Sequence, residues 1–261
     1  MKQEVPTLAS LFAEGKKASV VFWVGCAGSF DDRAKKITKA FVKIMNHTKT
    51  SFAVLGTEES CTGDPAKRAG NEFLFQTQAL QNIAALDKYG VTKIVTTCPH
   101  CFNTLKNEYP QLGGNYKVMH HTQFLKSLIK EGSLKVEGGK YKGKRITFHD
   151  PCYLGRANKI FEVPRSLIKK LDAELVEMKS CKTKGLCCGA GGAQMFKDAE
   201  GGTKEVNIER TEQALDTQPS IIAAACPFCN TMMTDGIKNK KQEDSVKIMD
   251  VAELIANANN L

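Results

Sequence analysis

The sequence has no apolar run long enough to cross a membrane, and its first residues lack the features of a secretory signal. The longest apolar stretches, such as residues 20–24, are far shorter than the about 20 residues that a spanning helix needs. The first 17 residues contain no unbroken apolar segment of the kind found in signal peptides. We therefore expect a cytoplasmic chain without a direct membrane span.

The chain also lacks a concentrated basic segment. Its net charge is +9, from 37 basic and 28 acidic residues, but the lysines are spread along the sequence. No basic motif is interleaved with aromatic residues, so the sequence argues against binding of nucleic acid. Such a distribution is typical of a solvated surface, and the positive field is suited to docking an acidic redox partner.

Several cofactor motifs are missing as well. There is no phosphate-binding P-loop and no Cys-x2-Cys-x2-Cys run of the ferredoxin type. The segment from Gly189 to Gln194 is similar to the nucleotide-binding GxGxxG pattern, but Gln194 stands at the last glycine position and a cysteine pair opens the segment. We therefore assign this glycine-rich segment to a metal site.

Cysteine, in contrast, is abundant, with ten residues in the chain. In a cytoplasmic protein this number indicates metal binding or redox chemistry more than a disulfide framework. Four cysteines of the first half have counterparts 126 or 128 positions later, pairing Cys26 with Cys152, Cys61 with Cys187, Cys98 with Cys226 and Cys101 with Cys229. The chain is therefore an internal repeat.

The repeat divides the chain into parts. We expect an N-terminal extension over residues 1–17, a first cysteine-rich domain over 18–130, a Lys/Gly-rich linker over 131–145 and a second cysteine-rich domain over 146–261. Short β-branched runs at residues 19–24, 51–55, 93–97 and 116–119 predict buried strands, and helical spacing of apolar residues separates them. This alternation predicts an α/β fold of two pseudo-two-fold related domains, each with a mostly parallel sheet flanked by helices.

In such sheets, ligands bind beyond the carboxyl ends of the strands, where the repeated cysteines are expected to lie. The second half offers five thiols, from Cys152, Cys187, Cys188, Cys226 and Cys229. Five exceeds what tetrahedral zinc or a cubane cluster uses, and adjacent cysteines suit a multi-iron cluster better than a single ion. Gly189, Gly191 and Gly192 would let the backbone approach the cluster and donate N–H bonds to sulfide. The alternative is a pair of structural cysteines beside a loop.

The arrangement Cys152-x34-Cys187-Cys188-Gly-x36-Cys226-Pro-x-Cys229 resembles the CCG cysteine-rich domain found in the B-type subunit of heterodisulfide reductase. The resemblance covers nearly the whole chain as two tandem copies. It implies that the five cysteines hold a noncubane [4Fe–4S] cluster, and that Cys187 and Cys188 would carry any chemistry done at the cluster. It also implies an oxidoreductase subunit whose electron partner is a ferredoxin-like iron–sulfur subunit or a flavoprotein.

The first half departs from this pattern, because Thr62 stands where the second cysteine of the pair would be. Four thiols remain, from Cys26, Cys61, Cys98 and Cys101. Four is the number needed by a cubane [4Fe–4S] cluster and also by structural zinc. Both cofactors remain open for the first site, so the chain is expected to bind either one or two clusters.

Several polar residues near these sites are candidates for supporting roles. His149 and Asp150 precede Cys152, and together with Arg156 they could supply protons, bind an anionic substrate or support the cluster. His100, inside the first Cys-x-x-Cys, is expected at a helix start. His120, His121 and Asp250 follow expected strands, where helix capping explains a polar residue. Cys181 has no counterpart and is expected to be a free, half-buried cysteine.

Two other functions are compatible with the cysteines. Cys98-Pro-His-Cys101 is similar to the redox pair of a thiol–disulfide oxidoreductase, although that interpretation leaves the other repeated cysteines without a role. Alternatively, the chain is a zinc-stabilised interaction module without redox activity.

Overall fold

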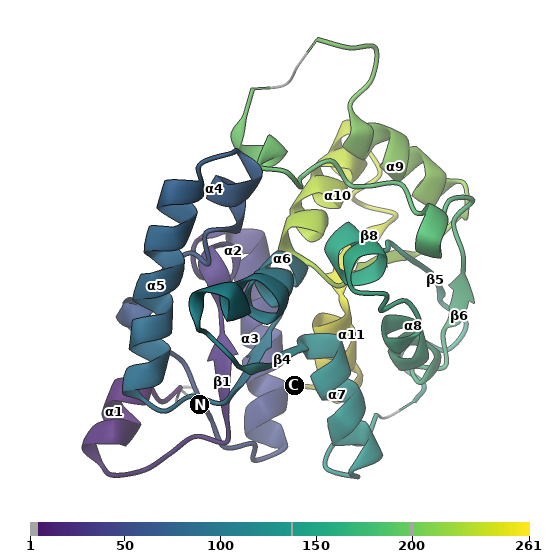
Figure 1. Cartoon of the computed structure of the whole chain (residues 1–261). Coiled ribbons are helices and arrows are strands. Elements are labelled where there is room, and N and C mark those ends of the chain that lie inside the picture. Colours follow the sequence, from purple (N-terminus) through teal and green to yellow (C-terminus); the bar gives the residue numbers. More distant parts are fainter. Residues whose placement is uncertain (1–4, 137, 199–200) are drawn as a thin grey trace.

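The computed structural model describes residues 5–136, 138–198 and 201–261 and contains two parallel four-stranded sheets (Figure 1). The first sheet has the order β2 (Phe52–Ala53), β1 (Val20–Trp23), β3 (Lys93–Thr96), β4 (Lys117–His120). The second repeats it as β6 (Glu174–Val176), β5 (Arg145–Phe148), β7 (Ile221–Ala224), β8 (Lys247–Asp250). The α/β fold of two similar halves, predicted from the repeat, is confirmed.

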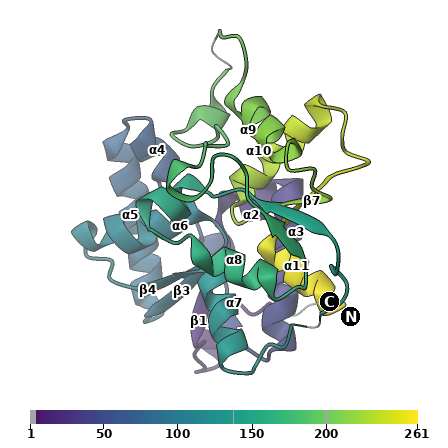
Figure 2. The same cartoon turned by 90° about the vertical axis from the view of Figure 1, so that its right-hand side faces the viewer.

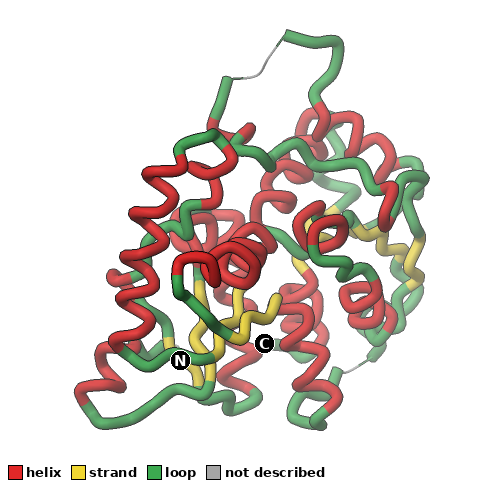
Figure 3. Tube along the Cα trace, in the orientation of Figure 1, coloured by secondary structure: helices red, strands yellow, loops and turns green. Residues whose placement is uncertain are grey.

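Helices surround both sheets, and the strands are short by comparison (Figure 3). The first half contributes α1 (Leu8–Ala13), α2 (Gly25–Phe30), α3 (Asp32–His47), α4 (Asp64–Arg68), α5 (Glu72–Lys88), α6 (Pro99–Asn103) and α7 (His121–Lys130). The second half contributes α8 (Glu162–Lys169), α9 (Val206–Leu215), α10 (Pro227–Asn239) and α11 (Val251–Ala258). Short π-helical segments follow α6 at Thr104–Glu108 and Cys152 at Tyr153–Ala157. Among the described residues, no helix is long and apolar enough to cross a membrane.

The described strands lie within one or two residues of the runs predicted for the first half. The apolar residues at helical spacing from Ala34 to Met45 lie in α3, and all are buried. Buried β-branched runs form central strands, since these residues fit a pleated surface covered on both faces. The local patterns therefore account for the order of the elements.

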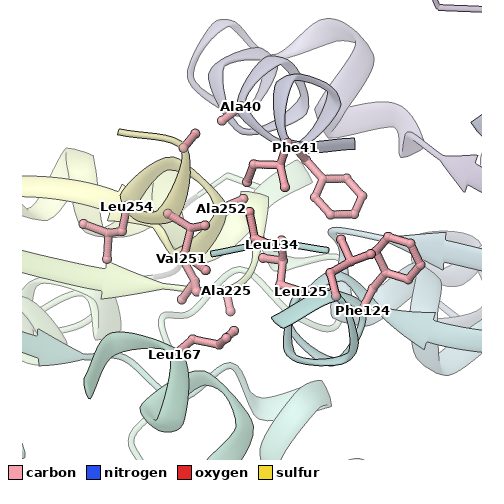
Figure 4. Packing of buried hydrophobic residues seen from close by; sticks show 14 of the residues in the cluster. Ala40, Phe41, Phe124, Leu125, Leu134, Leu167, Ala225, Val251, Ala252 and Leu254 are labelled. Carbon is pink, nitrogen blue, oxygen red and sulfur yellow. The ribbon is translucent and has the colours of Figure 1, made fainter. Parts of the chain in front are cut away.

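The two halves share one hydrophobic core. The largest apolar cluster joins Phe41 of α3 and Phe124 of α7 to Leu167 of α8 and Val251 of α11, which Figure 4 shows from close by. In the turned view of Figure 2, α7, α8 and α11 lie beside one another, and residue contacts join all three pairs. Leu134, from the segment between the halves, is 1% exposed and belongs to the same cluster. The halves are therefore packed as one body.

The segments at the predicted domain limits are partly described. In the predicted N-terminal extension, residues 1–4 lie outside the described part, and the following residues pair with the edge of the first sheet through Leu8 N to Val54 O at 2.8 Å. In the predicted linker, residue 137 lies outside it, and so do residues 199 and 200 of the second domain. Helix α7 ends at Lys130 and β5 begins at Arg145. The domain limits themselves remain a prediction.

Candidate metal centre

The five cysteines of the second half come from three segments that follow strands. Cys152 follows β5, Cys187 and Cys188 lie in the loop after β6, and Cys226 and Cys229 begin α10 after β7. The sulfurs of Cys152 and Cys187 are 4.0 Å apart, and those of Cys188 and Cys229 are 3.3 Å apart. Because parallel strands end at the same edge of the sheet, the fold brings together thiols that are far apart in the sequence.

The Cys-Pro-x-Cys segments explain part of this geometry. Cys98 and Cys226 are the N-cap residues of α6 and α10, and a proline occupies the first helical position after each of them. Proline favours that position because its fixed φ suits a helix and no N–H is lost from the helical ladder. The second cysteine of each segment, Cys101 or Cys229, then lies in the first turn of the helix, three residues after the N-cap cysteine.

The first half repeats the arrangement with one substitution. The backbone N–H of Gly63 points to the Cys61 sulfur at 3.4 Å, just as that of Gly189 points to the Cys187 sulfur at 3.4 Å. Thr62 Oγ1 faces the Cys101 sulfur at 3.9 Å, in the place where Cys188 faces Cys229 in the second half. Thr62 therefore occupies the position of the fifth thiol but offers only a hydroxyl.

The two sites adjoin each other. The thiols of Cys98 and Cys226, which are equivalent in the repeat, lie close enough across the boundary between the halves for each to shift the pKa of the other. Both side chains are almost fully buried, at 3% and 1% exposure. The sites are therefore neighbours within one buried, sulfur-rich region.

The thiols of the second site are packed too closely to ionise together without a cation. The neighbouring Cys187 raises the pKa of Cys152 through a hydrogen bond, and Cys187 likewise raises the pKa of Cys188 to about 12. For Cys226, burial is the largest cause of a raised pKa. Metal ions remove this conflict, because the thiolate is the form that binds metal.

The glycines after the cysteine pair keep the rim of the second site open. Gly189 has a φ of +91°, which only glycine adopts without strain. A Cβ built on Gly191 would lie 4.0 Å from the Cys152 sulfur, and nothing lies within 4 Å of one built on Gly192. The donor set of five thiols fits a bulky inorganic group. The glycine-rich segment that follows Cys187 and Cys188 leaves room for such a group beside the backbone.

His149 is the candidate polar residue that lies closest to the thiols. One of its ring nitrogens and the sulfurs of Cys188 and Cys229 lie within 4.8 Å of one another. Its Nδ1 accepts a hydrogen bond from Arg210 Nε at 3.0 Å, and burial lowers the pKa of His149 to about 3. Nε2 is buried and has no partner among the described residues. The proton on His149 Nε2 therefore needs a hydrogen-bond acceptor within the site.

Asp150 and Arg156, the other two polar candidates, are not placed as His149 is: Asp150 is bound to other residues and Arg156 points to the surface. Asp150 binds the buried guanidinium of Arg165 at 2.7 Å and accepts the backbone N–H of Lys182 at 2.7 Å. These contacts hold the segment that leads to Cys187. Arg156 is exposed. Since both Asp150 oxygens are occupied, its geometry favours support of the loop over proton supply.

His100 reaches from the first half to the second site, a placement that sequence reasoning missed. It stands at the expected helix start, and its Nδ1 lies 2.9 Å from Asp64 Oδ2. Its ring stacks on Tyr153 with centroids 4.2 Å apart, and a Cβ on Gly191 would lie 3.6 Å from its Cε1. Burial alone would lower the pKa of His100, but the bond to Asp64 raises it above its ordinary value.

The other histidines are structural. His120 is the N-cap residue of α7, and Asp250 caps α11 by accepting the N–H of Ala252 at 2.8 Å. His121 Nε2 also lies 2.9 Å from Asp250 Oδ1, and both side chains are fully buried. Capping was predicted for all three residues, but His121 is the first residue of α7 rather than its cap, and its contact with Asp250 between the halves was not predicted.

Two observations concern the thiol alternatives. Cys181 is half-buried beside Glu177, as expected for a free cysteine. Cys98 and Cys101 are buried, at 3% and 6% exposure, so neither sulfur is presented to an incoming protein disulfide as a surface redox pair requires. The geometry therefore favours a metal site over a dithiol exchange site.

A cavity of about 540 Å³ opens on the first site, with Cys26 and Cys61 in its lining. On its wall, the half-buried carboxylate of Glu59 accepts the backbone N–H groups of Val24 at 3.1 Å and Gly25 at 2.5 Å. Burial raises the pKa of Glu59 to about 7. The first site therefore borders an open cavity beside α2, the helix that carries Cys26.

Comparisons with known proteins agree with this geometry. The chain is 47% identical to a probable iron–sulfur-binding oxidoreductase, FadF, of Bacillus subtilis over 97% of this chain and 36% of that protein. It is 44% identical to an EtfAB:quinone oxidoreductase of Syntrophomonas wolfei, covering 93% of this chain and 34% of that protein. It is 34% identical to the D-type subunit of a dihydromethanophenazine:CoB–CoM heterodisulfide reductase of Methanosarcina barkeri, covering 93% of this chain and 59% of that protein.

The chain thus spans between about a third and three fifths of these relatives. The pattern that defines the CCG cysteine-rich domain matches twice, at residues 20–106 and 146–234. These two stretches contain all nine cysteines of the two sites. The resemblance inferred from the cysteine spacing is confirmed, and the chain belongs to the CCG cysteine-rich domain family, with two copies of the domain.

Proposed function

We propose that this chain is the cluster-binding part of an iron–sulfur oxidoreductase of the heterodisulfide reductase type. Its second site binds a noncubane [4Fe–4S] cluster through Cys152, Cys187, Cys188, Cys226 and Cys229. Its first site binds a cubane cluster or zinc through Cys26, Cys61, Cys98 and Cys101. The observation that carries the proposal is the convergence of five thiols, from three segments that follow strands, at the carboxyl edge of one parallel sheet.

A bound iron–sulfur cluster supplies one-electron transfer. The chain's own residues hold it and keep water away, since Cys188, Cys226 and Cys229 are at most 3% exposed. The N–H of Gly189 stabilises negative charge on the Cys187 sulfur. The proximity of Cys98 and Cys226, whose thiols shift each other's pKa, supports exchange of electrons between the two sites when both bind clusters. Any substrate chemistry is proposed to occur at the Cys187 and Cys188 side.

The electron partner is proposed to be a ferredoxin-like iron–sulfur subunit or a flavoprotein in the cytoplasm. The chain has neither a ferredoxin cysteine run nor a flavin motif of its own. The relatives are longer proteins, and the one from Syntrophomonas wolfei is named for a reaction between EtfAB and quinone. Both facts support a donor or acceptor outside this chain.

Metal analysis of anaerobically purified protein, combined with electron paramagnetic resonance, tests the proposal. About eight iron atoms per chain would mean a cluster in each half, and about four iron atoms with one zinc would make the first half structural. Zinc alone, after careful exclusion of air, would contradict the proposal and favour an interaction module.

The variant Cys188→Ser tests the five-thiol assignment. It removes the sulfur that lies 3.3 Å from that of Cys229, so we expect loss of the noncubane signal while metal stays at the first site. Cys181→Ser is the matched control, because Cys181 is half-buried and lies outside the thiol cluster. An unchanged spectrum in Cys188→Ser would exclude a five-cysteine ligand set.

A further inference from the structure

A buried arginine beside the second site has no carboxylate partner. Arg210 of α9 is 0% exposed, and its Nη1 donates to Ser180 O at 2.7 Å and to Gln213 Oε1 at 3.1 Å. Asp150 is within electrostatic range, but both its oxygens are bound to Arg165. Among the described residues, no carboxylate lies within 4.0 Å of the Arg210 nitrogens, whereas Arg165 has two such partners.

An unpaired guanidinium in the interior is costly, since arginine stays charged and loses its hydration. The Arg210 Nη2 atom is buried and has no partner among the described residues. The other ionisable groups that act electrostatically on Arg210 are the thiols of Cys229, Cys181 and Cys188. Two of these belong to the five-cysteine site. We therefore expect the negative charge that compensates Arg210 to lie in the five-cysteine site.

Arg210 also determines which nitrogen of His149 carries the proton. Because Arg210 Nε–H donates to His149 Nδ1, Nδ1 must be the acceptor and the proton must lie on Nε2. That Nε2–H is buried without an acceptor in the described part of the protein. The sulfurs of Cys188 and Cys229 lie within 4.8 Å of one ring nitrogen of His149, which makes them the candidate acceptors for this proton. Two unsatisfied donors thus come from one hydrogen-bonded pair.

The first half of the chain has a ring N–H at the position of His149 but, among the described residues, no buried arginine beside it. Trp23 precedes Cys26 by three residues, as His149 precedes Cys152, and its indole N–H is also buried without a described partner. Arg165 and Arg210 are the fully buried cations among the described residues, and both belong to the second half. A buried ring N–H without a described partner therefore stands at the same repeat position in both halves, whereas the buried positive charge is specific to the second.

We propose that Arg210 and His149 form one unit that stabilises the reduced state of the metal–sulfur centre in the second site. Arg210 supplies a buried positive charge and orients the ring, and His149 Nε2–H donates a hydrogen bond to a sulfur. Reduction adds one electron, delivered by the electron partner, and makes the centre more negative, while both side chains keep their protons. A nearby buried cation lowers the energy of that state and raises the midpoint potential. The inference rests on the proposed function.

The experiment is a redox titration of the full chain with its metal centres in place, followed by electron paramagnetic resonance. We expect Arg210→Met to shift the midpoint potential of the second centre to more negative values, with a smaller shift in Arg210→Lys. Lys238→Met is the matched control, because it removes a charge from a side chain that is 65% exposed. Solvent and salt screen such a charge, so the potential should stay unchanged.

His149→Phe tests the hydrogen bond. We expect it to remove one exchangeable proton coupling from the electron–nuclear double resonance spectrum in D2O exchange, with a negative shift in potential. If Arg210→Met does not retain its iron, Arg210→Lys and His149→Phe still decide the matter. An iron-loaded Arg210 variant with an unchanged potential and an unchanged proton coupling in His149→Phe would overturn this inference and leave the proposed function intact. An iron-free wild-type protein would overturn both.

Discussion

At the residue scale, the cysteine sets of the two sites differ by one side chain, Thr62 in place of the fifth thiol. The Thr62 hydroxyl is 1% exposed and faces Cys101, which is the repeat equivalent of Cys229. A hydroxyl is a poor ligand for iron or zinc beside thiolates, because these metals bind best to sulfur in such sites. The threonine therefore restricts the first site to four sulfurs without changing its shape.

Thr62→Cys should restore the missing thiol. The two side chains are close in size and Oγ1 already points toward the Cys101 sulfur at 3.9 Å, so the added sulfur needs no backbone movement. We expect the first site to gain iron and to show the spectrum of the second site. Metal analysis and electron paramagnetic resonance in a Cys188→Ser background would isolate this signal. Thr62→Ser, which adds no sulfur, is the control, and equal spectra for the two variants would contradict the expectation.

Residues close to a cysteine in the sequence were within reach of sequence reasoning, and residues brought in by the fold were not. His149 was a candidate because it precedes Cys152 by three positions. Arg210 was not, because it lies 19 residues before Cys229 on a helix without a cysteine. Trp23 could have been found, since aligning the repeat places it opposite His149. His100 contacts the site of the other half, and no spacing within one half reveals such a contact.

At the element scale, the turn after the cysteine pair is built on a left-handed glycine in both halves. Gly63 has a φ of +85° and is the N-cap of α4, and Gly189 has a φ of +91°. A Cβ on Gly63 would lie 2.8 Å from Phe75 Cδ2 and 3.2 Å from the Phe75 backbone. A Cβ on Gly189 would lie 3.4 Å from Val206 Cβ, which is an ordinary contact.

Gly63→Ala should therefore destabilise the protein more than Gly189→Ala. The left-handed backbone costs an alanine about 1–2 kcal/mol at either position. The clash with Phe75 adds about 1–3 kcal/mol at Gly63 alone, as overpacking does. Urea unfolding of the metal-loaded proteins measures the difference. Equal losses of unfolding free energy would mean that Phe75 moves aside freely.

The positions of the strands along the chain were predictable, because buried β-branched runs have a clear pattern. Which helices pack against one another was harder to predict. The apolar face of α3 was visible in the spacing of Ile37, Phe41 and Ile44, but its spacing carries no information on which surface covers it. In the structure, α3 packs against α11 and α10 of the other half, while Phe41 of its apolar face contacts Phe22 and Phe124 of its own half. The π-helical turns beside the sites also have no sequence signal, because the hydrogen bonds there shift under tertiary contacts.

At the scale of the whole molecule, the repeat is a single folded body. The shared apolar cluster, the buried His121–Asp250 contact and the ion pair between Arg33 and Glu253 at 2.6 Å all join the halves. The two cysteine sites meet at the same boundary through Cys98 and Cys226. A packed boundary holds the two cysteine sites beside each other, which suits the electron exchange that we propose between them.

Phe41→Ala tests whether the halves unfold together. Phe41 is 0% exposed, and its ring contacts those of Phe22 and Phe124 at centroid distances of 5.1 and 6.1 Å, within the core that both halves share. Truncation of a buried phenylalanine costs about 3–5 kcal/mol. Because one core serves both halves, this loss should lower the stability of the second half as well as the first.

Trp23 makes the measurement possible, since it is the single tryptophan of the chain and lies in the first half. Its fluorescence follows the first half, and far-ultraviolet circular dichroism follows the whole chain. In Phe41→Ala both transitions should shift to lower denaturant by the same amount and remain coincident, as two-state unfolding requires. A fluorescence transition that moves alone, ahead of an unmoved second transition in circular dichroism, would mean that each half unfolds on its own. The shared core would then be a docking surface between two independent domains.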